Sequence, residues 1–204
     1  AADSLRVLSI LMGDEGNWPE SESLAQEVLA IRRQRLGSEH PLVAASLADD
    51  AWAASHQGKW DRVKSLQREV LAMQCKLYGT QHPFYLASLG NLCSTLERLG
   101  KFTELEKLLD EQLTPAFKKQ PACANLLVLR AGLLSRQERW REAIDDAALA
   151  LEYQPANPDR YHMLAPLLAI AHQQPAYEQL CRTIITHFAN TTNVYVADRM
   201  AKDC

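Results

Sequence analysis

Apolar side chains recur along most of the chain at steps of three and four residues. Val43, Leu47 and Ala51 follow this spacing, and Leu89 and Leu92 follow it again further on. Residues three and four apart share one face of an α-helix, so each run predicts a helix with one apolar side. Another run of the same spacing follows each of these, and the chain therefore predicts helices in succession.

Turn residues divide the predicted helices into pairs. Gly58 and Gly100 each interrupt an apolar run, and glycine accepts the left-handed backbone that ends a helix. Pro41 and Pro83 stand in the first turn of a helix, where the N–H that proline lacks would have no partner. Each unit is thus an antiparallel helix pair, and its apolar faces need neighbours on both sides.

These pairs repeat at a fixed spacing, which indicates a solenoid. Gly16, Gly58 and Gly100 are evenly spaced, and an aromatic residue follows two positions after each. The spacing then shortens, since Trp140 follows Phe102 sooner than Phe102 follows Trp60. The pattern predicts a single array of helix pairs over about 1–36, 41–78, 83–118, 121–155 and 158–188, with the start of a capping helix at 193–204.

Two sets of residues resemble a known repeat family. Trp-Arg-Glu-Ala-Ile at 140–144, Ala-Leu-Glu at 150–152 and Pro155 resemble the tetratricopeptide repeat (TPR). The longer unit of the first part, with Leu-Gly-Ser-Glu-His-Pro at 36–41 and a close copy at 78–83, is similar to the longer TPR of kinesin light chains and of many bacterial proteins. The resemblance implies an all-α fold, a right-handed TPR superhelix (α-α solenoid) of about four to five helix pairs.

Composition agrees with helices and excludes some partners. The chain has 31 Leu and 28 Ala residues, which favour helix over strand. Its net charge of −3 supplies no broad basic field for nucleic acid or an anionic membrane. The longest apolar run, 164–171, is far shorter than the roughly 20 residues that span a bilayer, and no signal peptide is evident. We expect a cytoplasmic protein without nucleic-acid or membrane partners.

Candidate chemistry is sparse. The chain has no G-x-S-x-G, G-x-G-x-x-G or phosphate-loop motif. The adjacent pairs Asp49-Asp50 and Asp145-Asp146 diverge by about 100° on a helix, so we interpret them as solvated. His40 is interpreted, like its copy in the next repeat, as serving the turn before a helix. We predict no enzyme, no cofactor and no metal site.

Five cysteines lie too far apart for a zinc knuckle or a redox dithiol. Buried free cysteine packs like a small apolar side chain, and we interpret all five as such filler in a reducing compartment. They are Cys75, Cys93, Cys123, Cys181 and Cys204.

The resemblance to TPR proteins also implies a binding surface, because the first helix of each TPR pair lines a concave groove. The groove positions carried over from the family are Arg6, Asp49, Trp52, Ser55, Asn91, Ser94, Glu97, Arg98, Asn125, Arg136 and His162. An exposed Trp52 would anchor a partner, although a core position is the alternative. The amide of Asn91 would hold a ligand backbone, although it could equally be a surface residue without a partner.

Two known TPR binding modes are not matched. A carboxylate clamp of the chaperone type needs basic residues where Val128 and Leu129 stand, and the paired asparagines of kinesin light chains are replaced by Asp49-Asp50 and Gly90-Asn91. We therefore predict a protein- or peptide-binding scaffold with an unassigned partner.

Two alternatives stay open. The C-terminal part resembles TPR tails of bacterial signalling proteins, which implies a regulatory or oligomerisation module attached to a kinase or similar domain. The end helices could also stack on a second copy to form a homo-oligomer.

Overall fold

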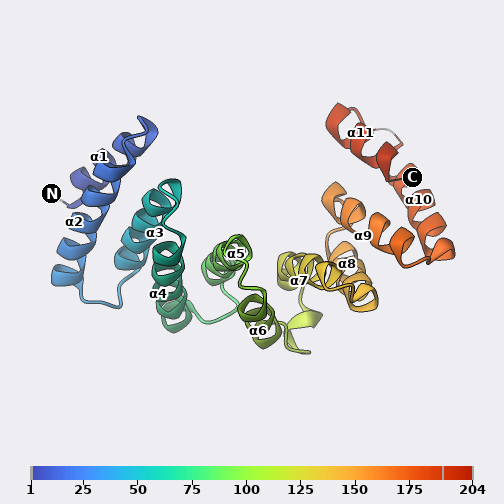
Figure 1. Cartoon of the computed structure of the whole chain (residues 1–204), viewed down its shortest axis with the longest axis horizontal. Coiled ribbons are helices and arrows are strands. Elements are labelled where there is room, and N and C mark those ends of the chain that lie inside the picture. Colours follow the sequence, from blue (N-terminus) through green and yellow to red (C-terminus); the bar gives the residue numbers. More distant parts are fainter. Residues whose placement is uncertain (1, 190, 204) are drawn as a thin grey trace. The chain divides into compact units, whose positions relative to one another are not determined.

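The computed structural model describes residues 2–189 and 191–203, except for the side chain of residue 199. Within them the regular structure is helical, as predicted, and Figure 1 shows the helices in chain order. The α-helices are α1 (Ala2–Asp14), α2 (Trp18–Leu36), α3 (Pro41–His56), α4 (Trp60–Tyr78), α5 (Pro83–Arg98), α6 (Phe102–Gln112), α7 (Ala124–Arg136), α8 (Trp140–Tyr153), α9 (Pro158–Ile170), α10 (Gln174–Phe188) and α11 (Val194–Lys202). Two single 3₁₀ turns, η1 (Phe117–Lys119) and η2 (Pro121–Cys123), join α6 to α7.

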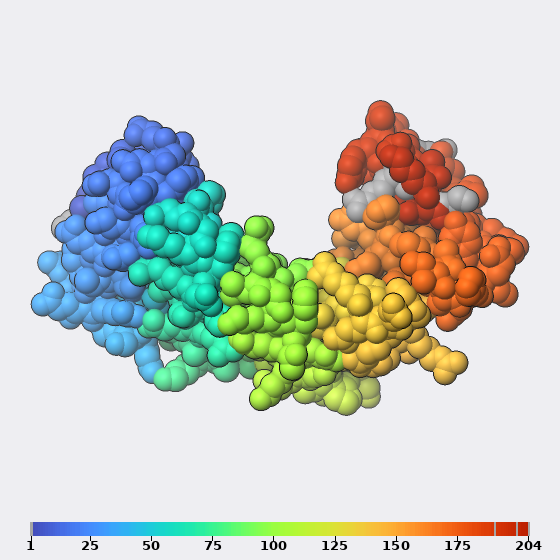
Figure 2. All heavy atoms as spheres, viewed as in Figure 1, coloured from blue at the N-terminus to red at the C-terminus, as the bar shows by residue number. Residues whose placement is uncertain are grey.

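The chain forms two compact units, residues 1–102 and 103–204. In the first unit α2 packs between α1 and α3, and α4 packs between α3 and α5. Side chains of these consecutive helices lie against one another without a break in the space-filling view (Figure 2). In the second unit α8 packs between α7 and α9, and both α10 and α11 pack on α9. Within each unit, consecutive helices therefore pack on one another as the predicted solenoid requires, and the division into five pairs in one continuous array over 1–204 stays a prediction.

The turn within each pair has one left-handed residue. Gly58 has φ +71° and Gly100 has φ +68°, values that glycine adopts without steric cost. Glu138 (φ +59°) and His172 (φ +54°) take the same place in the later, shorter pairs. Their N–H groups bond to the carbonyl three residues earlier, as the N–H of Gly58 does. A shared turn therefore persists where the glycine signal in the sequence is lost.

Polar side chains cap the starts of several helices. The Nδ1 atom of His40 accepts the N–H of Leu42 at 3.1 Å, and that of His82 accepts the N–H of Phe84 at 3.2 Å. This confirms that the repeated histidine serves the turn. Because Nδ1 is the acceptor, the ring proton of each neutral imidazole lies on Nε2. Before α11 the cap is Asn193.

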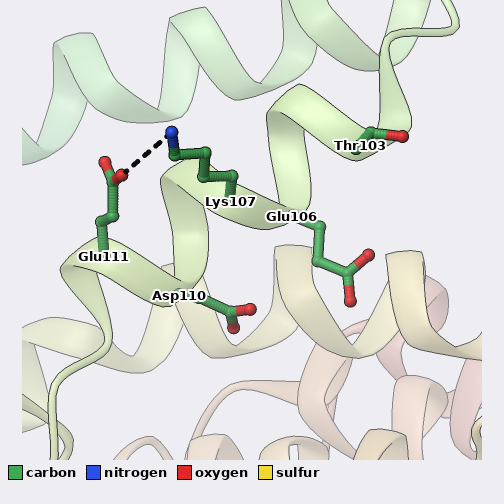
Figure 3. A pocket seen from close by; sticks show the side chains of 5 residues that line it. All are labelled: Thr103, Glu106, Lys107, Asp110 and Glu111. Carbon is green, nitrogen blue, oxygen red and sulfur yellow. Dashed lines mark ion pairs between the residues drawn. The ribbon is translucent and has the colours of Figure 1, made fainter.

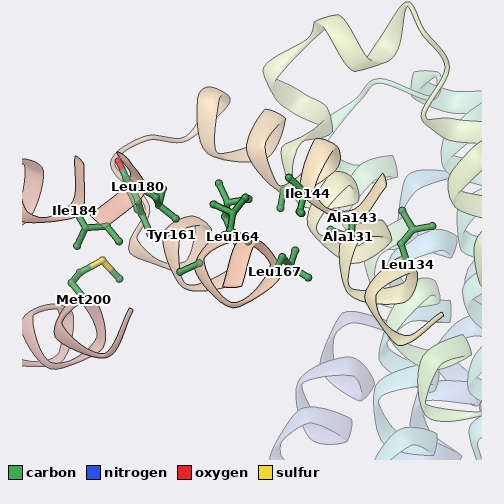
Figure 4. Packing of buried hydrophobic residues seen from close by; sticks show 13 residues of the cluster. Ala131, Leu134, Ala143, Ile144, Tyr161, Leu164, Leu167, Leu180, Ile184 and Met200 are labelled. Carbon is green, nitrogen blue, oxygen red and sulfur yellow. The ribbon is translucent and has the colours of Figure 1, made fainter. Parts of the chain in front are cut away.

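The second unit has a continuous apolar core, drawn in Figure 4. It runs from Leu134 on α7 through Ile144 on α8 and Leu164 on α9 to Leu180 on α10. Met200 of α11 is 4% exposed and joins the same cluster, so α11 closes this end of the core.

The connection between α6 and α7 explains the shorter spacing after Phe102. The predicted helix pair 83–118 ends early, because α6 stops at Gln112 and Pro115 follows. Phe117 turns inward and is buried, and the hydroxyl of Tyr153 donates to the carbonyl of Lys118. The connector is thereby fixed to α8.

No helix in the described residues combines the length and the apolar character that crossing a membrane requires.

Candidate functional site

The predicted groove residues fall into two sets, one in each unit. In the first unit they lie on α1, α3 and α5, the first helices of their pairs. In the second unit Asn125 and Arg136 lie on α7 and His162 lies on α9. Each set is described separately below.

Arg6 and Asp49 form a bidentate ion pair between α1 and α3. Nε of Arg6 lies 2.6 Å from Oδ2 of Asp49, and Nη2 lies 3.2 Å from Oδ1. The hydrogen bond and the charge of Asp49 raise the pKa of the Arg6 guanidinium above its usual value. Two charges predicted to face a ligand are thus joined to each other.

The side chain of Trp52 is partly packed against other helices and partly exposed. Its ring meets that of Trp18 edge to face, with centroids 4.9 Å apart and planes at 76°. A Cβ atom built on Gly13 would stand 2.6 Å from the Trp52 ring, so the ring rests on the backbone of α1. Nevertheless 40% of Trp52 is exposed. Trp52 is thus partly packed and partly exposed, and its role as an anchor for a partner stays a prediction.

His56 completes an aromatic cluster with Trp18 of α2 and Trp52 of α3, here called the α2/α3 cluster. Its ring is stacked on Trp18 with a centroid distance of 3.8 Å and an interplanar angle of 11°. Nδ1 lies 3.0 Å from the carbonyl oxygen of Trp52, which only accepts, so Nδ1 carries the proton. Sequence reasoning missed the contribution of Trp18, because the repeat pattern indicated only a turn aromatic there.

On α5 the polar side chains are more open. Asn91 and Ser94 are exposed, and Ser94 donates to the carbonyl of Gly90 at 3.1 Å. The amide of Asn91 makes no hydrogen bond within the described residues. Arg98 instead lies over the ring of Trp60, 4.4 Å from its centroid. Of the predicted α5 residues, Asn91 is the one with both amide donor and acceptor available.

Two of the remaining predicted residues have partners inside the chain. Nη2 of Arg160 donates to Oδ1 of Asn125 at 2.6 Å and so uses part of the acceptor capacity of that amide. Nδ1 of His162 lies 2.7 Å from Oδ1 of Asp203 and joins α9 to the end of α11. Arg136 and, in the first unit, Glu97 lie on their expected helices, and the hydroxyl of Ser55 donates to the carbonyl of Trp52 at 2.7 Å.

The aspartate pairs correct the sequence interpretation. Asp50 is 1% exposed and pairs with Arg62 at 2.8 Å, and Asp146 is 3% exposed and pairs with Arg130 at 2.5 Å. The solvated interpretation is wrong for these two, because the divergence of about 100° turns one member inward to meet a cation from a neighbouring helix. Asp145 is exposed, as predicted.

A buried polar network surrounds Asp50. Glu22, with 7% of its side chain exposed, accepts from Lys59 at 2.6 Å and lies 3.1 Å from Arg62. Burial raises the pKa of Asp50, and the hydrogen bond from Arg62 opposes this. Each carboxylate has a cation, so the network ties α2, α3 and α4 together and offers no free acid or base.

A surface depression lies along α6, lined by Thr103, Glu106, Lys107, Asp110 and Glu111 (Figure 3). Its acidic groups already have partners: Glu106 bonds to Arg139 and to Gln137, and Asp110 pairs with Arg130 at 2.8 Å. Nothing here resembles a catalytic arrangement.

The cysteines are only partly as predicted. Cys93 and Cys123 are buried, but Cys75 is exposed, so it is not apolar filler. Cys204 lies outside the described residues. Within those residues no group of three or more His, Cys, Asp or Glu side chains could hold a metal ion.

Comparisons with known proteins agree with this architecture. Residues 1–76 match the family model described as tetratricopeptide repeat. Tetratricopeptide repeats make up this part of the chain. No curated protein sequence matches the chain significantly.

Solved TPR structures resemble the chain over nearly its whole length. The crystal structure of a Podosopora anserina protein, described as a putative kinesin light chain with nearly identical TPR-like repeats, has a TM-score of 0.68 and 23% identity over 94% of this chain and 96% of that one. BtubC (BKLC) from P. vanneervenii has a TM-score of 0.69 and 18% identity, over 94% and 82%. MamA from Desulfovibrio magneticus has a TM-score of 0.66 and 13% identity, over 94% and 97%. The fold is therefore that of kinesin light chain-like TPR proteins.

Proposed function

We propose that the TPR chain is a protein-binding scaffold and that α1, α3 and α5 of its first unit bind an extended peptide. The observation that carries the proposal is Trp52, a large aromatic side chain that is 40% exposed and yet held in place by Trp18 and Gly13. A preorganised aromatic residue loses little conformational entropy on binding, which is why such residues anchor interfaces.

Asn91 supports the same surface. It is the repeat equivalent of Asp49 on the next first helix, and its amide is exposed. A side-chain amide can donate to a peptide carbonyl and accept from a peptide N–H at once. Next to it, a Cβ atom on Gly90 would meet no atom within 4 Å, so a peptide backbone could approach α5 closely.

A peptide selection tests the proposal. Twelve-residue peptides displayed on phage are selected against the whole chain, and the affinities of the enriched peptides are measured for Trp52→Ala, Asn91→Ala and Gln34→Ala variants. Gln34 is an exposed amide on α2 and serves as the matched control. We expect at least a tenfold loss for the first two variants and no change for the third. If the three variants bind the peptides with equal affinity, the peptides do not bind at this surface.

The homo-oligomer is a second candidate, favoured by one observation. Leu8 and Leu11 on α1 are 42% and 49% exposed, whereas their equivalents in the next repeat, Asp50 and Ala53, are fully buried. An apolar helix face of this kind could pack on a second copy. Light scattering at two concentrations decides it, since a constant mass of 22.9 kDa contradicts self-association. The regulatory module of a signalling protein stays a prediction.

A further inference from the structure

Two acidic residues without ion-pair partners in the described part of the chain follow the α1 residue on which the Trp52 ring rests. Asp14 directly follows Gly13, the residue on which the Trp52 ring rests, and Glu15 comes next in the turn after α1. Both side chains are exposed. Neither makes an ion pair within the residues that the structure describes.

The cations on the neighbouring helices are, in contrast, already engaged. Arg6 is paired with Asp49 and Arg62 is paired with Asp50, so their charges are balanced, whereas Arg98 keeps its charge and is held over the ring of Trp60 on α4. Arg32, 5% exposed, contacts Asp3 at 2.7 Å. Beside the α2/α3 cluster the charges of Asp14 and Glu15, unpaired among the described residues, are therefore negative, and a partner of opposite charge complements them.

The chemistry of an indole beside a carboxylate favours one kind of side chain. The face of tryptophan attracts cations, most strongly of the three aromatic side chains. A guanidinium group is planar, so it can stack on an indole while its N–H groups point to a carboxylate. An ammonium group is compact and strongly hydrated, and it does this less well.

We propose that Trp52 and Asp14 together bind an arginine side chain of a basic peptide. The inference rests on the proposed function, because it assigns the chemical class of the peptide that α1, α3 and α5 bind. Arginine stacks on the exposed part of Trp52 and pairs with Asp14, and Glu15 adds attraction at longer range. A peptide with acidic side chains at this position meets repulsion instead.

Fluorescence anisotropy with three labelled peptides tests the inference on the whole chain. Each peptide has a Gly-Ser backbone with two arginines, two citrullines or two glutamates. Citrulline keeps the shape of arginine without its charge. We expect the arginine peptide to bind at least ten times more tightly than the other two, and its affinity to fall as salt is raised.

Single variants test whether Asp14 and Trp52 cause the preference for the arginine peptide. Asp14→Asn is expected to weaken the arginine peptide at least threefold and to flatten its salt dependence. Trp52→Phe keeps an aromatic ring but binds cations less strongly, and it is expected to weaken the same peptide. Glu27→Gln removes an exposed carboxylate from α2 and is the matched control, expected to leave the affinity unchanged.

Several results overturn the inference. They are equal binding of the citrulline peptide, better binding of the glutamate peptide, no binding of the arginine peptide at millimolar concentration, or equal effects of Asp14→Asn and Glu27→Gln. A dimer in light scattering that Trp52→Phe dissociates would also overturn it, since a second copy would then occupy the surface. If phage-selected peptides still depend on Trp52 and Asn91 in any of these cases, the proposed function stands and only its arginine specificity fails.

Discussion

The ring of Trp52 on α3 packs directly against the backbone of Gly13 on α1. A Cβ atom on Gly13 would stand 2.6 Å from Cζ3 and 2.7 Å from Cη2 of Trp52, closer than real Cβ contacts. Glycine at this position thus lets the ring lie against α1 beside Trp18. The pair fixes the orientation of the one tryptophan among the predicted groove residues.

Gly13→Ala is expected to destabilise the first unit by about 1–3 kcal/mol, because the added methyl group forces the ring to move. Unfolding in urea measures the change. Gly90→Ala is the control. Its methyl group meets no atom within 4 Å on α5, so the helix should gain about 0.5–1 kcal/mol. Equal effects of the two changes would contradict the role of the Gly13 contact.

Arg62→Ala is expected to destabilise the chain by about 2–4 kcal/mol, because it leaves the buried carboxylate of Asp50 without its cation. Unfolding in urea measures this loss. The double change Asp50→Leu with Arg62→Ala should restore most of the stability, since Leu92 occupies the equivalent position in the next repeat. A double variant that is no more stable than Arg62→Ala would show that the ion pair is not the cause.

Acid is expected to weaken the second unit through Glu106. Hydrogen bonds from Gln137 and then Arg139 lower the pKa of this carboxyl below its usual value of 4.5. An acid whose pKa is lowered in the folded state stabilises the fold above its unfolded pKa, and this stabilisation is lost as the pH falls through the folded pKa. Thermal unfolding between pH 6 and pH 3 should therefore depend less steeply on pH in Glu106→Gln. An unchanged slope would exclude Glu106 as a contributor.

Thiol reactivity should separate the cysteines. Cys75 is exposed on α4, whereas burial raises the pKa of Cys93 to about 12 and leaves almost no thiolate at neutral pH. Brief treatment with iodoacetamide at pH 7.5, followed by peptide mapping, should find Cys75 modified at least a hundred times faster than Cys93. Urea should remove the difference, and comparable native rates would contradict the burial of Cys93.

Local chemistry explains which features could be predicted from sequence. The turn at Gly58 and the cap at His40 depend on neighbouring residues, and both appear where the repeat pattern places them. Side chains that meet partners on other helices could not be assigned in this way. Arg6 pairs with Asp49 on a helix far along the chain, and the solvated interpretation of Asp146 fails because its partner Arg130 lies on a different helix.

For the candidate site, too, the sequence predicts which residues face outward but not which of them have partners on other helices. The family resemblance selects Trp52 and Asn91 as facing outward, and both are exposed. It also selects Asn125, whose amide oxygen already accepts a hydrogen bond from Arg160. An outward-facing residue is available to a partner only if no side chain from a helix two positions along the chain reaches it. The periodicity of the sequence does not show which side chains reach that far.

The buried network around Asp50 works only with the repeats in their present order along the chain. Glu22, Asp50 and Arg62 have Lys64, Leu92 and Glu104 as their counterparts in the next repeat, so both outer positions change the sign of their charge and the middle one becomes apolar. If α3 were followed by α6 instead of α4, Asp50 would meet Glu104 in place of Arg62 and its carboxylate would be stranded. The repeats share a backbone conformation but cannot be exchanged for one another. In a shuffled or duplicated array, the side chains at each new contact between helices would have to be redesigned.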